Sequence, residues 1–118
     1  MAVESAPLFV LWEKIAGDLL ERTARFPKAW RFSFAVRIDN LALDVLERLA
    51  EAQVSPPGRK VMLLRDADAS LLRLKVLTRL AHAQRLMDHG GYEHVARSLD
   101  EVGRMLGGWL KQQRGIAA

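Results

Sequence analysis

Four stretches of helical periodicity, separated by three short breaks, constrain this chain more than any other feature of its sequence. In each stretch apolar residues recur at steps of three and four, the spacing that gathers side chains on one face of an α-helix. The stretches cover residues 7–26, 27–52, 59–88 and 92–113. Ser5 is placed to cap the first helix, and Pro7 fits its first turn. The pattern predicts an all-α fold.

The three breaks consist of residues that end helices or begin new ones. Phe26 precedes Pro27, and a residue before proline disfavours the helical conformation while proline itself suits a first turn. Residues 54–58 read Val-Ser-Pro-Pro-Gly, which cannot continue a helix. Residues 89–91 read His-Gly-Gly, and we expect them to supply a left-handed cap at the end of the third helix.

Chain length and connection length predict how the helices pack. The chain has 118 residues, half of them apolar, which suits a single domain over residues 1–118 with a sizeable core. Short connections between helices of about twenty residues or more favour neighbours that run in opposite directions. We therefore predict an antiparallel, up-down-up-down four-helix bundle.

The third helix carries apolar residues on two faces. One stripe consists of Leu64, Ala67, Leu71, Leu74, Thr78 and Ala81. A second stripe, turned away from the first, consists of Met62, Ala69, Leu72, Val76, Leu80, Ala83 and Met87. A small bundle core needs only one of them, so we predict that the second stripe, from Met62 to Ala83, is the interface of a homo-oligomer. The alternative is a central third helix that shares both faces with its neighbours in the same chain.

The fourth helix combines helical spacing with glycines that disfavour helix. Each glycine costs a helix interior about 1 kcal/mol relative to alanine, so glycines suggest that something packs closely there. Ala96, Gly103 and Gly107 fall on one flank of this helix, beside its apolar face. We interpret Gly103, Gly107, Gly108 and Trp109 as packing residues of the bundle and favour this over a ligand site.

The sequence lacks the motifs of enzymes and metal proteins. It has no cysteine, so thiolate chemistry and disulfides are excluded. A di-iron bundle needs Glu-x-x-His motifs, and none occurs; the only histidines are His82, His89 and His94. Neither the phosphate-binding Gly-x-x-x-x-Gly-Lys loop nor the Gly-x-Ser-x-Gly nucleophile motif is present. We predict no catalysis, no cofactor and no metal.

The basic residues are candidates for contacts with phosphates. The formal net charge is +4, and in an antiparallel bundle the first and third connections gather cations at one end. Several of these cations lie near helix C-termini, where they complement the helix dipole: Arg25, Arg85, Lys111 and Arg114. The better candidates for binding nucleic acid are Lys28, Arg31, Arg73 and Arg79.

Nothing in the sequence suggests export or a membrane span. An acidic residue, Glu4, stands where a secretory signal carries cations, and charges interrupt every apolar run. We expect a cytoplasmic protein without membrane contacts.

Three motifs carry a resemblance to a known family. They are Phe26-Pro27-Lys28-x-x-Arg31, Leu77-Thr78-Arg79-Leu80-Ala81 and Glu101-Val102-Gly103-Arg104-Met105-Leu106-Gly107-Gly108-Trp109-Leu110-Lys111. Together they resemble the four-helix bundle family of the accessory variability determinants, which serve diversity-generating retroelements. A related branch, encoded within ribosomal RNA genes, carries an Asn-Ile-Ala-Glu-Gly-like segment; residues 39–43 here read Asp-Asn-Leu-Ala-Leu, which favours the retroelement branch.

The resemblance implies a function. Members of the family form a basic homopentameric ring that binds nucleic acid and associates with a reverse transcriptase. Lys28, Arg31 and Arg79 match basic positions of the family pattern. We therefore expect a non-enzymatic, oligomeric adaptor that binds RNA or DNA. The alternative is a structural bundle that contacts only other proteins.

Overall fold

Four long helices account for most of the protein, whose computed structural model describes residues 2–117, with side chains described from residue 7 to residue 116. They are α1 (Ala2–Thr23), α2 (Val36–Gln53), α3 (Pro57–Ala83) and α4 (His89–Ala117). Two short elements precede α2, the 3₁₀ turn η1 (Lys28–Trp30) and the π-helical turn η2 (Arg31–Ala35). Residues 2–117 contain no strand, and the helices pack as a bundle, so the predicted all-α fold is confirmed.

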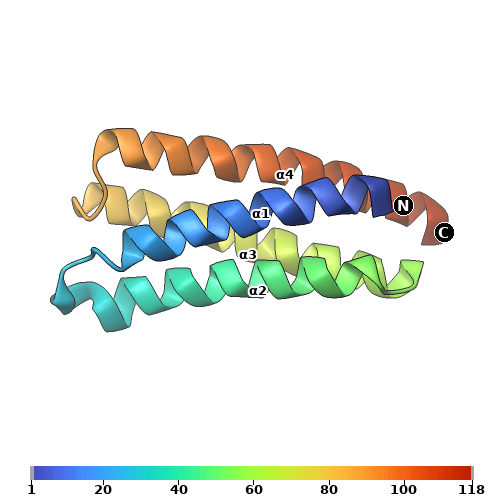
Figure 1. Cartoon of the computed structure of the whole chain (residues 1–118), viewed down its shortest axis with the longest axis horizontal. Helices are drawn as coiled ribbons and strands as arrows, with labels where there is room; N and C mark the ends of the chain where they lie inside the picture. Colours follow the sequence, from blue (N-terminus) through green and yellow to red (C-terminus); the bar gives the residue numbers. More distant parts are fainter. Residues whose placement is uncertain (1, 118) are drawn as a thin grey trace.

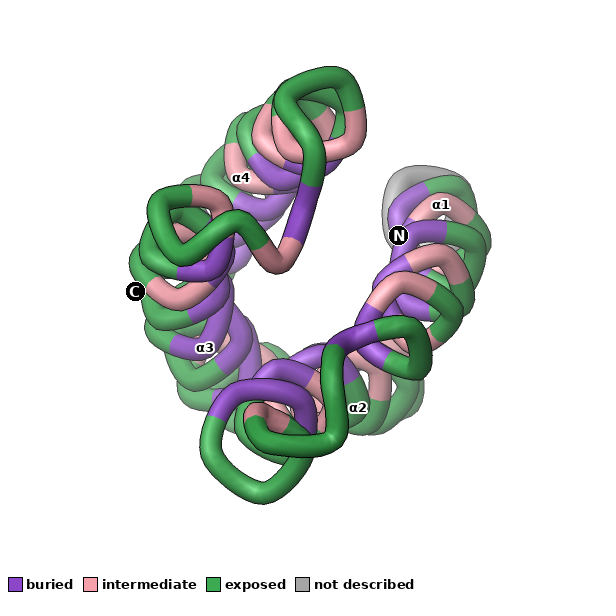
Figure 2. Tube along the Cα trace, turned by 90° about the vertical axis from the view of Figure 1, so that its left-hand side faces the viewer, coloured by how far each residue is buried: buried purple, intermediate pink, exposed green. Residues whose placement is uncertain are grey.

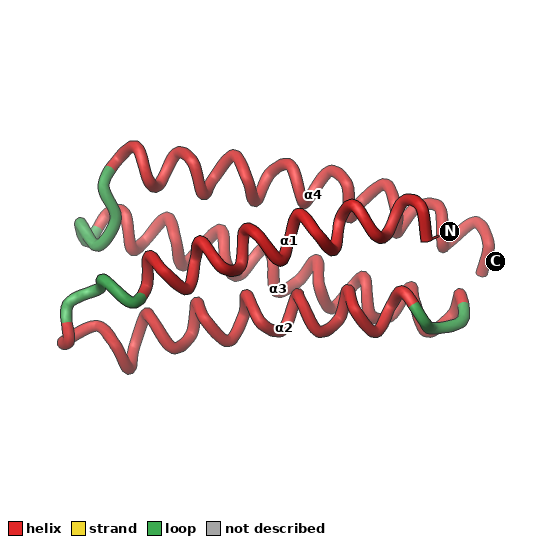
Figure 3. The backbone as a smooth tube through the Cα atoms, viewed as in Figure 1, coloured by secondary structure: helices red, strands yellow, loops and turns green. Residues whose placement is uncertain are grey.

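The connections between the helices lie at the two ends of an elongated molecule of 46 × 24 × 20 Å. The segment between α1 and α2 and the loop between α3 and α4 lie at the same end (Figure 1). The short loop between α2 and α3 lies at the other end, as do both ends of the described chain. All of the loops are brief (Figure 3). Residues far apart in the sequence, around positions 30 and 85, therefore share one end of the bundle.

The helices follow one another around a common core. Viewed along the bundle, α1 lies beside α2, α2 beside α3, and α3 beside α4, with buried residues on the inner side (Figure 2). α1 and α4 make the least contact of the neighbouring pairs. The indole of Trp12, fully buried, donates its Nε1 hydrogen to the carbonyl oxygen of Ala42 at 2.9 Å, which ties α1 to α2. A buried indole needs such a partner, so this bond also orients α1.

The first apolar stripe of α3 forms the centre of the core, as the sequence predicts. All six of its residues are buried: Leu64, Ala67, Leu71, Leu74, Thr78 and Ala81. Thr78 is the one polar member, and its hydroxyl donates to the carbonyl oxygen of Leu74 at 2.8 Å within the same helix. Because that bond satisfies the hydroxyl, the side chain packs as an apolar group would.

The start of α1 and the end of α4 differ from the prediction. α1 begins at Ala2, so Pro7 lies inside the helix and the predicted start after Ser5 is wrong. The side chain of Ser5, expected to cap, lies outside the described residues. α4 continues to Ala117, beyond the predicted end at Gln113. α1 begins before its predicted start and α4 ends after its predicted end. A single proline or glycine weakens helical structure near a terminus without excluding it.

The α3–α4 junction also differs from the prediction. α3 ends at Ala83 and α4 begins at His89, and no described glycine has a positive φ. Arg85 has φ 62° instead, and the amides of Arg85 and Leu86 donate to the carbonyls of His82 and Ala81. These bonds form a Schellman cap with a non-glycine residue in the left-handed position.

The glycines assigned to that cap belong to the first turn of α4. The carboxylate of Asp88 accepts a hydrogen bond from the amide of Gly91 at 2.6 Å, which caps this helix. A Cβ at Gly91 would overlap the guanidinium of Arg22, which lies against it. The glycine therefore leaves room for the Arg22 side chain of α1 against the first turn of α4, a contact between distant residues that the local sequence does not reveal.

The left-handed Arg85 predicts a stabilising substitution. We expect Arg85→Gly to raise the free energy of unfolding by about 1 kcal/mol, because glycine adopts this conformation without the clash of a Cβ. The neighbouring Gln84, at φ −85°, is the matched control, and Gln84→Gly should lower stability. Urea denaturation of both variants measures the difference; a loss of stability in Arg85→Gly would contradict the assigned backbone.

Candidate functional site

An exposed apolar ridge runs along the outer face of α3. Leu72 is 63% exposed, Val76 is 59% exposed and Leu80 is 46% exposed. All six residues predicted as an interface are exposed: Met62, Ala69, Leu72, Val76, Leu80 and Ala83. Met87, at the end of the same stripe, is instead buried. The other three helices of the chain therefore leave this ridge uncovered, which argues against the alternative in which they share both faces of α3.

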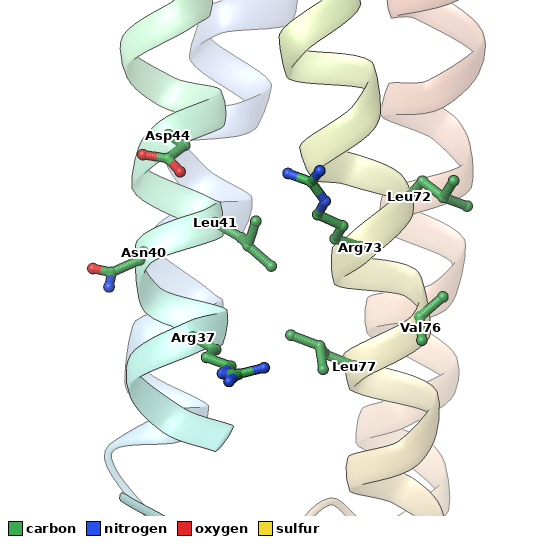
Figure 4. Close-up of a pocket in the computed structure, with 8 residues that line it drawn as sticks. All are labelled: Arg37, Asn40, Leu41, Asp44, Leu72, Arg73, Val76 and Leu77. Atoms are coloured by element: carbon green, nitrogen blue, oxygen red, sulfur yellow. The ribbon is translucent and has the colours of Figure 1, made fainter. Parts of the chain in front are cut away.

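A groove lies on each side of the ridge. The groove between α2 and α3 has a volume of about 500 Å³. Leu41 and Leu77 extend into it from opposite walls, as do the guanidinium groups of Arg37 and Arg73 (Figure 4). The groove between α3 and α4 has a volume of about 340 Å³ and is lined partly by Arg79 and Tyr92. Leu72 and Val76 border both grooves, so a ligand that covers the ridge would contact both.

The four cations predicted to bind nucleic acid occupy two regions of the surface. Lys28 lies in η1 and Arg31 in η2, at one end of the bundle. α3 ends at the same end of the bundle, one turn after Arg79. Arg73 lies farther back, in the groove with Arg37. All four side chains are exposed. The structure therefore brings Lys28, Arg31 and Arg79 to one end of the bundle, whereas Arg73 lines the α2–α3 groove and Arg79 the α3–α4 groove, on opposite sides of the ridge.

These cations carry charge that other residues do not neutralise. Ion pairs in the described part of the chain include Arg22 with Asp18 and Arg59 with Glu51, both at 2.8 Å. Lys75 pairs with Asp100 across α3 and α4 at 3.4 Å. None of the ion pairs formed by residues 7–116 includes Lys28, Arg31, Arg73 or Arg79. Exposed, unpaired cations attract phosphates without first having to break a salt bridge.

The glycines of α4 have different surroundings. A Cβ at Gly103 would lie 3.6 Å from Leu71 and 3.5 Å from Lys75, an ordinary packing distance. Trp109 is buried. By contrast, a Cβ at Gly107 or Gly108 would meet no described atom within 4 Å. Close packing within the chain thus occurs at Gly103 and Trp109 and is absent at the other two glycines.

The histidines lie near the α3–α4 junction. The imidazole of His82 stacks on the ring of Tyr92, with centroids 4.4 Å apart and planes 6° from parallel. His89 and His94 are exposed. Among the described residues no three histidine or carboxylate side chains gather so as to hold a metal ion. In the same part of the chain no helix is both long and apolar enough to cross a membrane.

The sequence reasoning missed one exposed aromatic residue at the basic end. Phe32, in η2, is 82% exposed. The signal was available, because Phe32 falls outside the helical spacing of the buried residues Phe34, Ile38 and Ala42. An aromatic side chain that lies off the buried face has no packing role within the chain, and this marks it as a candidate for contact with a ligand.

The open surroundings of Gly107 predict another stabilising substitution. Gly107→Ala should raise the free energy of unfolding of the isolated protein by about 1 kcal/mol, because alanine favours helix and its methyl group meets nothing. Thermal unfolding followed by circular dichroism measures this change. A decrease in stability would contradict the open surroundings of Gly107.

Comparison with known proteins gives the family. No curated protein matches the sequence. A family model described as bAvd-like matches residues 10–113, a range that takes in parts of all four helices and the three motifs quoted above. The chain therefore belongs to the bacterial accessory variability determinant family of diversity-generating retroelements, a family of accessory proteins and not a known catalytic family.

Proposed function

We propose that this protein is a non-enzymatic adaptor that binds nucleic acid through its basic end and holds a reverse transcriptase during the copying of a retroelement. The observation that carries the proposal is the run of residues 23–38, which contains four cations, Arg25, Lys28, Arg31 and Arg37, and no acidic residue. This run spans the connection between α1 and α2 and the first turn of α2, which contains Arg37. Such a local excess of positive charge favours the phosphate backbone of RNA or DNA.

The bundle topology concentrates this charge. We infer an antiparallel, up-down-up-down arrangement from the alternation of the connections between the two ends. It brings the last turns of α3, with Arg79, and the loop with Arg85 to the same end as Lys28 and Arg31. Three acids at this end have partners in the chain, since Asp39 accepts a hydrogen bond from the hydroxyl of Thr23, Asp88 caps α4 and Glu93 lies 3.6 Å from His89. The end therefore offers phosphates a surface with few competing carboxylates.

The exposed ridge of α3 supports a homo-oligomer. Leu72 and Val76 lie more than half exposed between two grooves, and apolar side chains of this size gain about 1.5–3 kcal/mol each when fully removed from water. A second copy could cover the ridge with its own apolar face. The family resemblance favours a pentameric ring, which would repeat the basic end around its axis and strengthen the attraction for polyanions.

The partner follows from the family. An accessory protein of a diversity-generating retroelement acts beside the reverse transcriptase of that element, so we propose this enzyme as the protein partner. The ridge also favours a second candidate function, a bundle that contacts only other proteins, because apolar exposed surface suits protein interfaces whatever the charge nearby. The two functions differ in whether nucleic acid binds at low salt.

Reversal of charge at the basic end tests nucleic-acid binding. The double variant Lys28→Glu with Arg79→Glu should lose the retention of structured RNA in a gel shift, because repulsion replaces attraction at both positions. Wild-type binding should weaken steeply as salt rises. Lys14→Glu with Arg65→Glu, two exposed positions on α1 and α3, makes the same change of net charge and is the matched control.

Full binding by the Lys28 and Arg79 double variant would exclude this site. Equal losses in both double variants would indicate that only net charge matters. A wild-type protein that retains no RNA even at low salt would instead favour the second candidate function.

A charge on the ridge tests the oligomer. Val76→Glu should convert the assembled protein into single chains, because a carboxylate buried between subunits without a partner opposes association. Sedimentation velocity at micromolar concentration measures the change. Val54→Glu is the matched control, because Val54 is 87% exposed in the α2–α3 loop and away from the ridge. A wild-type protein that sediments as a single chain would contradict the proposed oligomer.

A further inference from the structure

Phe32 is the most exposed large aromatic side chain of the described residues, at 82%. It lies in the π-helical turn η2, which precedes α2 at the basic end of the bundle. An exposed phenyl ring gains free energy when a contact removes it from water. Nothing in the fold requires an aromatic residue here, so the ring is available for an external contact.

The backbone holds Phe32 in a defined position. The amide of Trp30 donates to the carbonyl of Pro27 at 2.9 Å, and the amide of Val36 donates to the carbonyl of Arg31, which closes the π turn. The rings of Trp30 and Phe34, which lie two residues before and two residues after Phe32, pack on each other with centroids 5.4 Å apart. Phe34 is buried and Trp30 packs against the core. Phe32 is therefore presented by an anchored segment, and its exposure is a property of the fold.

The surroundings of Phe32 are basic. Lys28 precedes it by four residues, Arg31 is adjacent, and Arg37, in the first turn of α2, follows by five. All three side chains are exposed, and none of them forms an ion pair among residues 7–116. Ser33, next in the chain, adds an exposed hydroxyl. Along the chain, Phe32 thus lies in a segment, residues 23–38, that contains cations and no acid.

We propose that Phe32 stacks on an unpaired base of a single-stranded nucleic acid whose neighbouring phosphates contact Lys28 and Arg31. This inference rests on the proposed function and gives its site a substrate class. Single-strand-binding surfaces combine a stacking aromatic with cations that follow the backbone, and both parts are present here. A duplex would contact the cations but could not offer the face of a base, because its bases are already stacked on one another.

The charge around Phe32 favours nucleic acid over a protein as the occupant. The centre of a protein interface is depleted of charged residues, because their desolvation is costly. Phe32 has cations on both sides along the chain, and a protein partner would have to supply acids for each of them. A strand of nucleic acid supplies a base and regularly spaced phosphates together.

Binding of two fluorescent RNA probes tests the inference on the full chain. One probe is an oligouridylate of about 16 nucleotides, within the range of single-strand site sizes, and the other is a duplex of the same length. Phe32→Ala should weaken binding of the single strand about 5- to 150-fold, the effect of losing one stacked base, and leave the salt dependence unchanged. Binding of the duplex should change little. Phe32→Tyr should keep the affinity of the wild type, because the ring is retained.

Val54→Ala is the matched control, since it truncates an equally exposed apolar residue at the other end of the bundle, and it should bind both probes as the wild type does. If the wild type binds both probes and Phe32→Ala is unchanged, the stacking role is wrong while the proposed function stands. The stacking role would also be wrong if Phe32→Ala weakened binding of both probes equally or changed the sedimentation coefficient. Either result would assign the ring to protein packing. If the wild type binds neither probe, the proposed function fails and the inference fails with it.

Discussion

The structure depends on one constraint, that α3 is apolar on two faces while the rest of the chain can bury only one. The stripe around Leu71 and Leu74 is buried where α3 packs between α2 and α4, and it forms the centre of the core. Its burial sets the positions of the neighbouring helices, because apolar side chains must interdigitate at close packing. The ridge around Leu72 and Val76 then has to point outward, since the two faces belong to the same helix. Core and exposed ridge are two consequences of a single helical pattern.

The same geometry separates apolar contacts from electrostatic ones. The ridge runs along the side of the bundle, whereas Lys28 and Arg31 lie at one end, and Arg79 lies beside the ridge in the α3–α4 groove. An assembly built along the sides would leave the ends open to solvent and to polyanions. Protein association and nucleic-acid binding can therefore occupy different surfaces of one small domain. Arg73 lines the groove on one side of the ridge and Arg79 lines the groove on the other side. The apolar and the basic surfaces meet at these two grooves.

Junctions were the part of the fold that sequence reasoning predicted least well. The glycines at positions 90 and 91 were assigned to the end of α3, yet they form the first turn of α4, and Arg85 takes the left-handed position instead. Asp88 explains the difference, because its carboxylate caps α4 and so sets the start of that helix. Likewise, no local signal announces the π turn between Arg31 and Ala35, since the packing of Trp30 on Phe34 stabilises it. Both choices involve contacts within four residues of the chain, between Asp88 and Gly91 and between Trp30 and Phe34, which helical periodicity does not specify.

The sequence by itself determined that the chain is all-helical, which face of α3 enters the core, and which family the chain belongs to. Periodicity and short motifs carry this information, because helical spacing and the hydrophobic effect act along a single segment. Tertiary structure alone decided that the neighbouring helices leave the ridge uncovered and that Gly103 packs while Gly107 does not. These properties depend on the distances between segments that are far apart in the sequence. The residue pattern of one helix does not specify which residues of other helices lie beside it.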